Sequence, residues 1–158
     1  MRFHLYELTV TRRRRALACE PPATWAFQNL TSPEDVGKLA TMLFQSILGN
    51  ELLREHMMVF QLDRRNRVIG YELVGVGTVS SVETSAADVF RSAILLGASS
   101  VIMAHNHPSG DCSPSKEDEW ITKRMIDAGM TLGIALIDHV IVGAHHGYSF
   151  ANKIEFPL

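Results

Sequence analysis

Cysteine is scarce in this sequence: Cys19 and Cys112 are the only two in 158 residues. Two cysteines can form at most one bridge, so the composition excludes a disulfide framework. Long apolar runs are also missing, because none approaches the ~18 residues that a membrane-spanning helix needs. The N-terminus lacks the apolar core of a signal peptide. We therefore expect a cytoplasmic protein with reduced thiols and no membrane partner.

A strong charge of either sign is absent as well, since the formal net charge is −2 and the pI is about 6.4. This balance does not favour nucleic acid as a partner, although it does not exclude it. Four arginines at residues 12–15 can bind phosphate. In a near-neutral chain, however, such a run is more often a solvated strand edge or loop, and this is the interpretation that we favour. With 46% hydrophobic residues and no internal repeat or linker, the sequence predicts one domain over residues 1–158.

One stretch, residues 104–118, concentrates side chains that can bind a metal. Residues 99–104 form a short apolar run typical of a buried strand, and His105 and His107 lie at its end. Because side chains alternate along a strand, the two histidines can project to the same side, roughly 6–7 Å apart at the backbone. Neutral imidazoles suit Zn²⁺, which binds them at about 2.0–2.1 Å. The spacing therefore predicts that they share one metal ion.

A carboxylate follows in the same stretch. Pro108 and Gly110 break the strand, and Pro114 predicts a helix that has this proline at its first position. Ser115 and Asp118 then lie three residues apart on one face of the first turn. Three protein ligands leave a fourth position open for water, as in catalytic zinc sites.

Two alternatives stay open from these residues alone. Ser115 and Asp118 also match a helix capping box, which needs the same spacing and no metal. Cys112 could replace Asp118 as the third ligand, and a thiolate there would favour a closed structural site.

The full spacing resembles the JAMM motif of the JAB/MPN-domain metallopeptidases, here His105, His107, Ser115 and Asp118. The surrounding residues resemble the RadC-like branch of that superfamily in several segments: His-Asn-His-Pro-Ser-Gly-Asp at 105–111, Asp-His-Val-Ile-Val-Gly at 138–143, Glu-His at 55–56 and Gln-Leu-Asp at 61–63. The likeness covers about residues 32–150 and therefore most of the chain.

The resemblance implies a three-layer α/β fold in which helices flank a mixed central sheet, related to the fold of cytidine deaminases. It implies Zn²⁺ held by His105, His107 and Asp118. It also implies that Ser115 stabilises the oxyanion and that an upstream glutamate is the general base. Full-length RadC-like proteins usually carry an N-terminal helix-hairpin-helix segment, for which this sequence has no room.

The upstream glutamate belongs where an early helix runs into a strand, about fifty residues before the histidines. Glu55 stands at such a place, directly before an apolar stretch, and is the residue that we predict. Glu51 lies one helical turn earlier and Glu72 lies in the next expected strand, so both remain alternatives. If Glu55 has no such role, its carboxylate is expected to face solvent at a helix end.

These residues predict a zinc-dependent hydrolase that cleaves a peptide or isopeptide bond in an unidentified protein or peptide. Zn²⁺ can lower the pKa of water toward 7, Glu55 would accept its proton, and Ser115 would hold the developing oxyanion. A deaminase would need His-x-Glu and Cys-x-x-Cys, which the sequence lacks. DNA repair, the label of the RadC-like family, and a metal-bound interaction module without turnover remain as alternatives. The oligomeric state is open.

Periodicity and turn residues predict the remaining elements in this order: a strand at 3–11, a helix from Ser32 that Gly49 ends or bends, a hairpin of strands 57–62 and 67–76, a helix from Ser85 to Gly97, a helix from 114 to about 129, a strand over 132–142 and a last short strand at 148–150. A bulge or turn is expected at 75–77. In the helix after Ser85 we expect Val89, Ile94 and Leu95 to face inward.

Asp138 and His139, in the strand over 132–142, could be a second catalytic pair. A structural pair at a bend or bulge is the favoured interpretation, because the metal motif already has its ligands. His145 and His146 are expected to be exposed residues of a hairpin turn.

Overall fold

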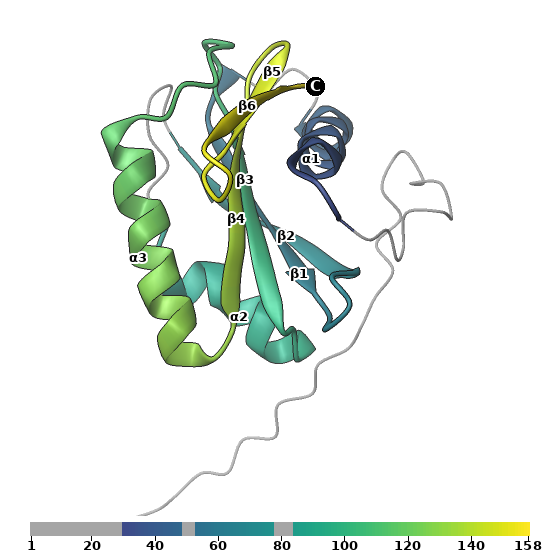
Figure 1. Cartoon of the computed structure of the whole chain (residues 1–158), viewed down its shortest axis with the longest axis vertical. Coiled ribbons are helices and arrows are strands. Elements are labelled where there is room, and N and C mark those ends of the chain that lie inside the picture. The colour runs from purple at the N-terminus through teal and green to yellow at the C-terminus, as the bar shows by residue number, and fades with distance from the viewer. Residues whose placement is uncertain (1–29, 49–52, 78–83) are drawn as a thin grey trace, which may run out of the picture.

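A single sheet with helices on both of its faces forms the three layers of the fold (Figure 1). The computed structural model describes residues 30–48, 53–77 and 84–158. The expected strand at 3–11, the four arginines and Gly49 lie outside these ranges. The described elements are α1 (Pro33–Leu48), β1 (His56–Leu62), β2 (Val68–Val76), α2 (Ala86–Leu96), β3 (Ser100–Asn106), α3 (Lys116–Leu132), β4 (Ala135–Val142), β5 (His146–Ser149) and β6 (Ile154–Pro157).

The sheet is mixed, as predicted. Its six strands have the order β2-β1-β3-β4-β5-β6. Only β3 and β4 pair in parallel, and α3 connects them, whereas all the other neighbours are antiparallel. A parallel pair needs such a crossover, because its second strand has to start at the same end of the sheet as the first.

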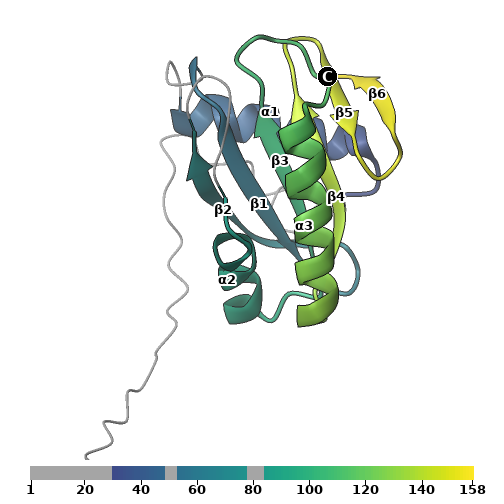
Figure 2. The same cartoon turned by 90° about the vertical axis from the view of Figure 1, so that its left-hand side faces the viewer.

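Each face of the sheet has its own apolar core. α1 covers one face together with Phe156 of β6, and α2 and α3 cover the other (Figure 2). β1 and β3 are buried along their whole length, which explains why they read as continuous apolar runs. Among the described residues no helix combines the length and the apolarity needed to cross a bilayer.

The side chains of β3 alternate between these two cores. Ile102 and Ala104 pack on the side of α1, and Val101 and Met103 pack on the side of α2 and α3. Because the period of a strand is two residues, His105 continues the second set and faces the layer that contains α3. The strand pattern thus decides which helix can supply a partner to His105.

The β1–β2 hairpin is present, with an irregularity at or directly beside each expected place. Asp63 begins the turn, and Asn66 adopts a positive φ of 57° within it. Opposite Met57 and Met58 the partners are Gly75 and Leu73, so Val74 is an extra residue of β2, and this bulge lies directly before the segment 75–77 in which a bulge or turn was expected. Two further shifts occur: β2 has another extra residue, Ile69, between the partners of Gln61 and Leu62, and β4 has a bulge directly before Asp138, where the register to β3 shifts by one residue.

α2 begins with the predicted capping box between Ser85 and Asp88 and ends at Gly97, whose φ is +64°. The predicted inner face was wrong in part. Ile94 and Leu95 are 55% and 46% exposed, and Phe90 and Ala93 are buried beside Val89. The reason is helical geometry: five residues turn the helix by ~500°, so residue 94 points roughly 140° away from residue 89.

The predicted bounds of α3 were wrong at both ends. Ser115 is the N-cap, because its side chain accepts a hydrogen bond from the backbone N–H of Asp118, and Pro114 therefore precedes the helix. Gly129 lies inside the helix, packed closely against the carbonyl of Ile134. The helix continues to Gly133, which has a φ of +70° and supplies the left-handed C-cap.

A sixth strand was missed by the sequence patterns, which had the chain end on a strand at 148–150. β5 ends at Ser149 and pairs with β6 at the edge of the sheet. Three of the four residues of β6 are exposed, and only Phe156 is buried. A short edge strand with one apolar anchor has too little alternation to be recognised from sequence.

Gly129 provides a test of the packing between α3 and the following turn. An added Cβ would lie 2.5 Å from the carbonyl oxygen of Ile134 and 3.2 Å from Cζ of Phe90. Alanine favours a helix by ~1 kcal/mol over glycine, but overpacking of this kind costs about 1–3 kcal/mol. We expect Gly129→Ala to lower the free energy of unfolding in urea by ~1–2 kcal/mol.

The neighbouring residue Met130, 70% exposed, is the control for this variant. Met130→Ala should change stability by no more than ~0.5 kcal/mol. A Gly129→Ala protein as stable as the parent would show that the turn after α3 can move to make room.

Candidate metal centre

His105 and His107 meet at the end of β3, on the side of the sheet that α3 covers. His105 is the penultimate residue of the strand and is 1% exposed. His107 follows the strand, and the Nε2 atoms of the two rings lie 3.0 Å apart. The prediction that both imidazoles project to the same side is confirmed.

Asp118 approaches both histidines from the first turn of α3. Its Oδ1 lies 3.1 Å from Nε2 of His105, and its Oδ2 lies 3.4 Å from Nε2 of His107. One nitrogen from each histidine and one oxygen from Asp118 all lie within 4.8 Å of one another, so the three residues could hold a metal ion. Two imidazole nitrogens and a carboxylate oxygen are a donor set that divalent metals of borderline softness prefer.

Each of these groups has a shifted pKa. Burial raises the pKa of Asp118, but the close contacts with His105 and His107 outweigh burial and hold the pKa well below its ordinary value. Burial lowers the pKa of His105. Burial also acts to lower the pKa of His107, but Asp118 and the carbonyl of Asp111 outweigh it and raise this pKa above 6.5. In the metal-free protein, His107 is therefore the histidine of the group that holds a proton most readily.

The loop after His107 is tied to the end of β4. The N–H of His107 donates to the carbonyl of Val142, and the N–H of Ala144 donates to that of Gly110. Gly110 has a φ of +83°, which a residue with a side chain rarely adopts. Nδ1 of His107 lies 2.7 Å from the carbonyl oxygen of Asp111. A carbonyl only accepts, so Nδ1 carries the hydrogen and Nε2 faces the other ligands.

Glu55 lies directly before β1 and is 8% exposed, which argues against the alternative of a helix-end carboxylate that faces solvent. Burial raises the pKa of Glu55, and the charges of His107 and Asp118 are near enough to shift it too. The carboxylate of Glu55 therefore lies within electrostatic reach of two of the three candidate ligands, His107 and Asp118. Of the two alternatives, Glu72 points to Arg91 on α2, 3.3 Å away, and Glu51 lies outside the described residues.

Asn106 holds the backbone on both sides of Glu55. Its Oδ1 accepts from the N–H of His56 at 2.9 Å, and its Nδ2 donates to the carbonyl of Arg54 at 3.0 Å. The residue between the two histidines thus orients the segment that carries the glutamate. The sequence patterns did not assign this role, because it joins residues about fifty positions apart.

Ser115 and Asp118 form the capping box that the sequence had left open as an alternative. The Ser115 hydroxyl donates to Oδ2 of Asp118 at 2.6 Å and accepts from its backbone N–H at 3.1 Å. The same carboxylate also faces the histidines, so the two interpretations are compatible. Ser115 itself is exposed.

Several other candidates lie away from the three ligands. Cys112 is a buried free thiol that does not belong to the group. Asp138 is structural, since its carboxylate accepts from the N–H groups of His139 and Ala151 and from the hydroxyl of Ser149. The last two candidates, His145 and His146, are exposed.

His139 has contacts that the sequence patterns did not predict. It does follow the bulge in β4, as predicted, but its Nε2 lies 2.8 Å from Nδ1 of His105. Its own Nδ1 lies 2.6 Å from the hydroxyl of Thr122 on α3. In the register of the parallel strands His139 is the partner of Met103, two residues before His105, so the contact is diagonal and no spacing within one strand predicts it.

A mixed sheet with two histidines at the end of one strand and an aspartate on the next helix is the arrangement that the JAMM-motif resemblance implied, that of a JAB domain. The chain belongs to the RadC-like JAB domain family, whose model matches residues 30–155.

Curated relatives of this chain are named UPF0758 proteins, a name that states no activity. One from Caldanaerobacter subterraneus subsp. tengcongensis is 41% identical over 125 residues, which cover 79% of this chain and 52% of the relative. One from Desulforamulus reducens is 37% identical over 139 residues, which cover 88% of this chain and 58% of the relative. One from Thermotoga maritima is 48% identical over 104 residues, which cover 66% of this chain and 47% of the relative. The chain thus spans about half the length of these relatives.

A matched pair of aspartates tests the ligand group. Asp118 and Asp88 occupy the same position in two capping boxes, but only Asp118 faces histidines. Asp118→Ala and Asp88→Ala should each cost the metal-free protein ~1 kcal/mol of stability through the lost cap. We expect Asp118→Ala and His107→Ala to lose bound metal in elemental analysis, and Asp88→Ala to retain it. Metal retained by both ligand variants would refute the assignment.

The raised pKa of His107 predicts how metal binding depends on pH. A metal needs the lone pair of Nε2, which a proton occupies below the pKa of the ring. Affinity should therefore fall as the pH drops through a value above 6.5, by up to ~10-fold per pH unit for one displaced proton. Competition with a chelator from pH 8 to pH 6 measures this slope. Replacing the exposed His146 by glutamine should leave it unchanged, and a flat profile would contradict the assignment.

Proposed function

We propose that this chain is a zinc-dependent hydrolase that cleaves a peptide or isopeptide bond. The observation that carries the proposal is the convergence of His105, His107 and Asp118 beside the buried carboxylate of Glu55. Metal ligands with an adjacent carboxylate of raised pKa are the parts that water activation at neutral pH requires.

The distances within the group favour zinc. A tetrahedral ion with bonds of ~2.0–2.1 Å places its ligand atoms roughly 3.3–3.4 Å apart. The two Nε2 atoms lie 3.0 Å apart, that of His105 lies 3.1 Å from Oδ1 of Asp118, and that of His107 lies 3.4 Å from its Oδ2, which is near these values. The ligand side chains therefore need little movement to accept the ion, and three protein ligands leave a fourth position for water.

In this proposal each neighbouring residue has one task. When bound, zinc supplies Lewis-acid activation of water. Glu55 accepts a proton from the water molecule while the water oxygen bonds to the carbonyl carbon of the substrate. It then returns this proton to the leaving nitrogen as the carbon–nitrogen bond breaks. The raised pKa of Glu55 suits both transfers, because a base works best near the operating pH. Ser115 donates its hydroxyl hydrogen to the developing oxyanion after turning it away from Asp118.

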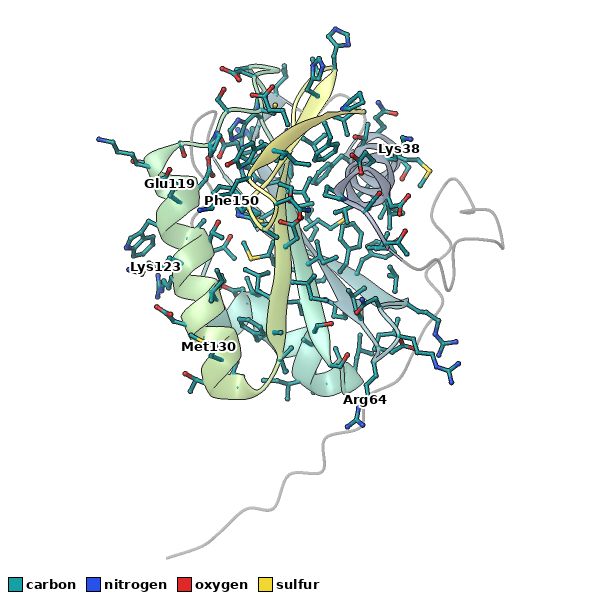
Figure 3. All side chains as sticks on the ribbon, in the orientation of Figure 1. Lys38, Arg64, Glu119, Lys123, Met130 and Phe150 are labelled. Carbon is teal, nitrogen blue, oxygen red and sulfur yellow. The ribbon has the colours of Figure 1, made fainter. Side chains whose placement is uncertain are left out.

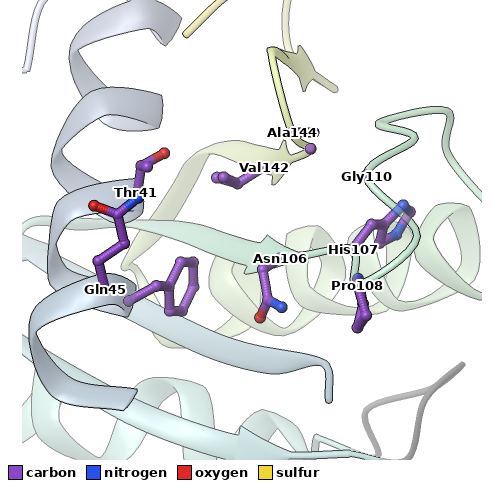
Figure 4. A pocket seen from close by; sticks show the side chains of 10 residues that line it. Thr41, Gln45, Asn106, His107, Pro108, Gly110, Val142 and Ala144 are labelled. Carbon is purple, nitrogen blue, oxygen red and sulfur yellow. The ribbon is translucent and has the colours of Figure 1, made fainter. Parts of the chain in front are cut away.

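A hollow of about 250 Å³ lies between α1 and the loop after β3 and shares His107 with the candidate ligands (Figure 4). Thr41 and Gln45 of α1 line one side, and Asn106 and His107 line the other. No Asp, Glu, Lys or Arg side chain is among its lining residues. We propose that an uncharged segment of a protein or peptide substrate lies here while the scissile bond reaches the ligands.

Two glutamates allow a controlled test of the general base. Glu55→Gln keeps the size of the side chain but removes the proton acceptor, so we expect bound zinc to remain and hydrolysis of a quenched fluorescent peptide library to fall by at least ~100-fold. Glu72→Gln, in which the carboxylate paired with Arg91 is lost, should keep both zinc and turnover. In the parent, activity should decline as the pH falls through the raised pKa of Glu55, because the protonated acid cannot act as a base.

Equal activity in Glu55→Gln and the parent would remove Glu55 from the mechanism. Zinc binding by the parent with no turnover on any peptide or isopeptide would instead favour a metal-bound interaction module.

A further inference from the structure

Three buried polar side chains form a continuous chain behind the ligands. It runs from the backbone carbonyl of Asp118 through the hydroxyl of Thr122 to His139, and from His139 to Nδ1 of His105. The three contacts measure 2.6, 2.6 and 2.8 Å. Thr122 is 7% exposed, and the two histidines are 0% and 1% exposed, so water cannot replace these partners.

The direction of each hydrogen bond in this series follows from its first acceptor, the backbone carbonyl of Asp118. The carbonyl of Asp118 can only accept, so the single hydroxyl hydrogen of Thr122 has to point to it. The Thr122 oxygen then has only lone pairs to offer His139, and Nδ1 of His139 has to donate.

The same logic fixes the two rings. Neutral imidazole carries one hydrogen, so His139 with Nδ1–H has a lone pair at Nε2. That lone pair faces Nδ1 of His105, which therefore carries the hydrogen of the second ring. His105 is left with a lone pair at Nε2, which can accept from a protonated Nε2 of His107, 3.0 Å away. The carboxylate of Asp118, 3.1 Å from the same atom, favours the opposite tautomer, so Thr122 and His139 have to outweigh it.

We propose that Thr122 and His139 are positioning residues that hold His105 in the Nδ1–H tautomer, with Nε2 free to bind metal. The chain begins on the backbone of one ligand, Asp118, and ends on the ring of another, His105. It therefore ties α3, β4 and β3 together around the site. Partners of this kind orient ligating histidines and raise their affinity for metal by ~10–100-fold. The inference rests on the metal site of the proposed function but not on hydrolysis.

The tautomer can be read in the metal-free protein, which separates this inference from zinc binding and from turnover. Long-range ¹H–¹⁵N correlation at about pH 8 distinguishes imidazole nitrogens that carry hydrogen from those with a lone pair. We expect Nδ1–H for both His105 and His139 in the parent and in Thr122→Ser, which keeps the hydroxyl. In Thr122→Val, which keeps the shape of threonine, both rings should show mixed tautomers.

Metal affinity is the second measurement, with Co²⁺ as a spectroscopic probe and Zn²⁺ in competition. Thr122→Val and His139→Phe should bind about 10–100-fold more weakly than the parent, and Thr122→Ser should restore binding. His139→Phe can still stack on Phe150, whose ring lies 5.0 Å away at 11°, so a role in packing alone would leave affinity unchanged. Figure 3 shows where Phe150 lies relative to α3.

Nε2–H at His105 in the parent would overturn the proposal. Parental tautomers and parental Co²⁺ affinity in Thr122→Val would also overturn it. This outcome can be measured even if His139→Phe does not fold. Loss of affinity in both Thr122→Val and Thr122→Ser would assign the effect to packing and would also refute it.

Discussion

The alternation of side chains along β3 is the constraint on which the metal centre depends. β3 is buried on both faces, and its odd-numbered residues pack toward α2 and α3. His105 therefore lies in the layer to which α3 brings Asp118. A shift of one residue would turn every side chain of the strand to the opposite face. His105 would then point toward α1, and the three ligands would separate. The apolar pattern of a buried strand thus sets the position of the chemistry.

Asp118 combines a local role and a role in the centre in one carboxylate. Its Oδ2 accepts from the backbone and hydroxyl of Ser115, as in any capping box. Its Oδ1 faces His105, which a carboxylate with several lone pairs permits. The box formed by Ser85 and Asp88 at the start of α2 has the same local geometry without histidines. A capping aspartate can therefore become a candidate ligand only where a strand end supplies imidazoles on the facing side.

Prediction from sequence succeeded where the governing contacts are local. The turn after β3, the capping boxes and the shared side of His105 and His107 all depend on neighbours within a few residues. It failed where a segment has little pattern of its own, as in β6 with the single anchor Phe156. It also failed where apolar residues were assigned without helical spacing, as at Ile94 on α2. The fold class followed from family resemblance and is confirmed by the mixed sheet between helices.

The sequence by itself determined which residues could form a metal group, because their types and spacing suffice once a strand is followed by a helix. Only the tertiary structure decided what supports that group. Asn106 reaches the backbone beside Glu55 across 50 residues, and His139 reaches His105 across 34. These contacts exist because β1 and β4 pair with β3 on either side. Strand pairing is a long-range choice of partner and register, and no pattern within a single segment encodes it.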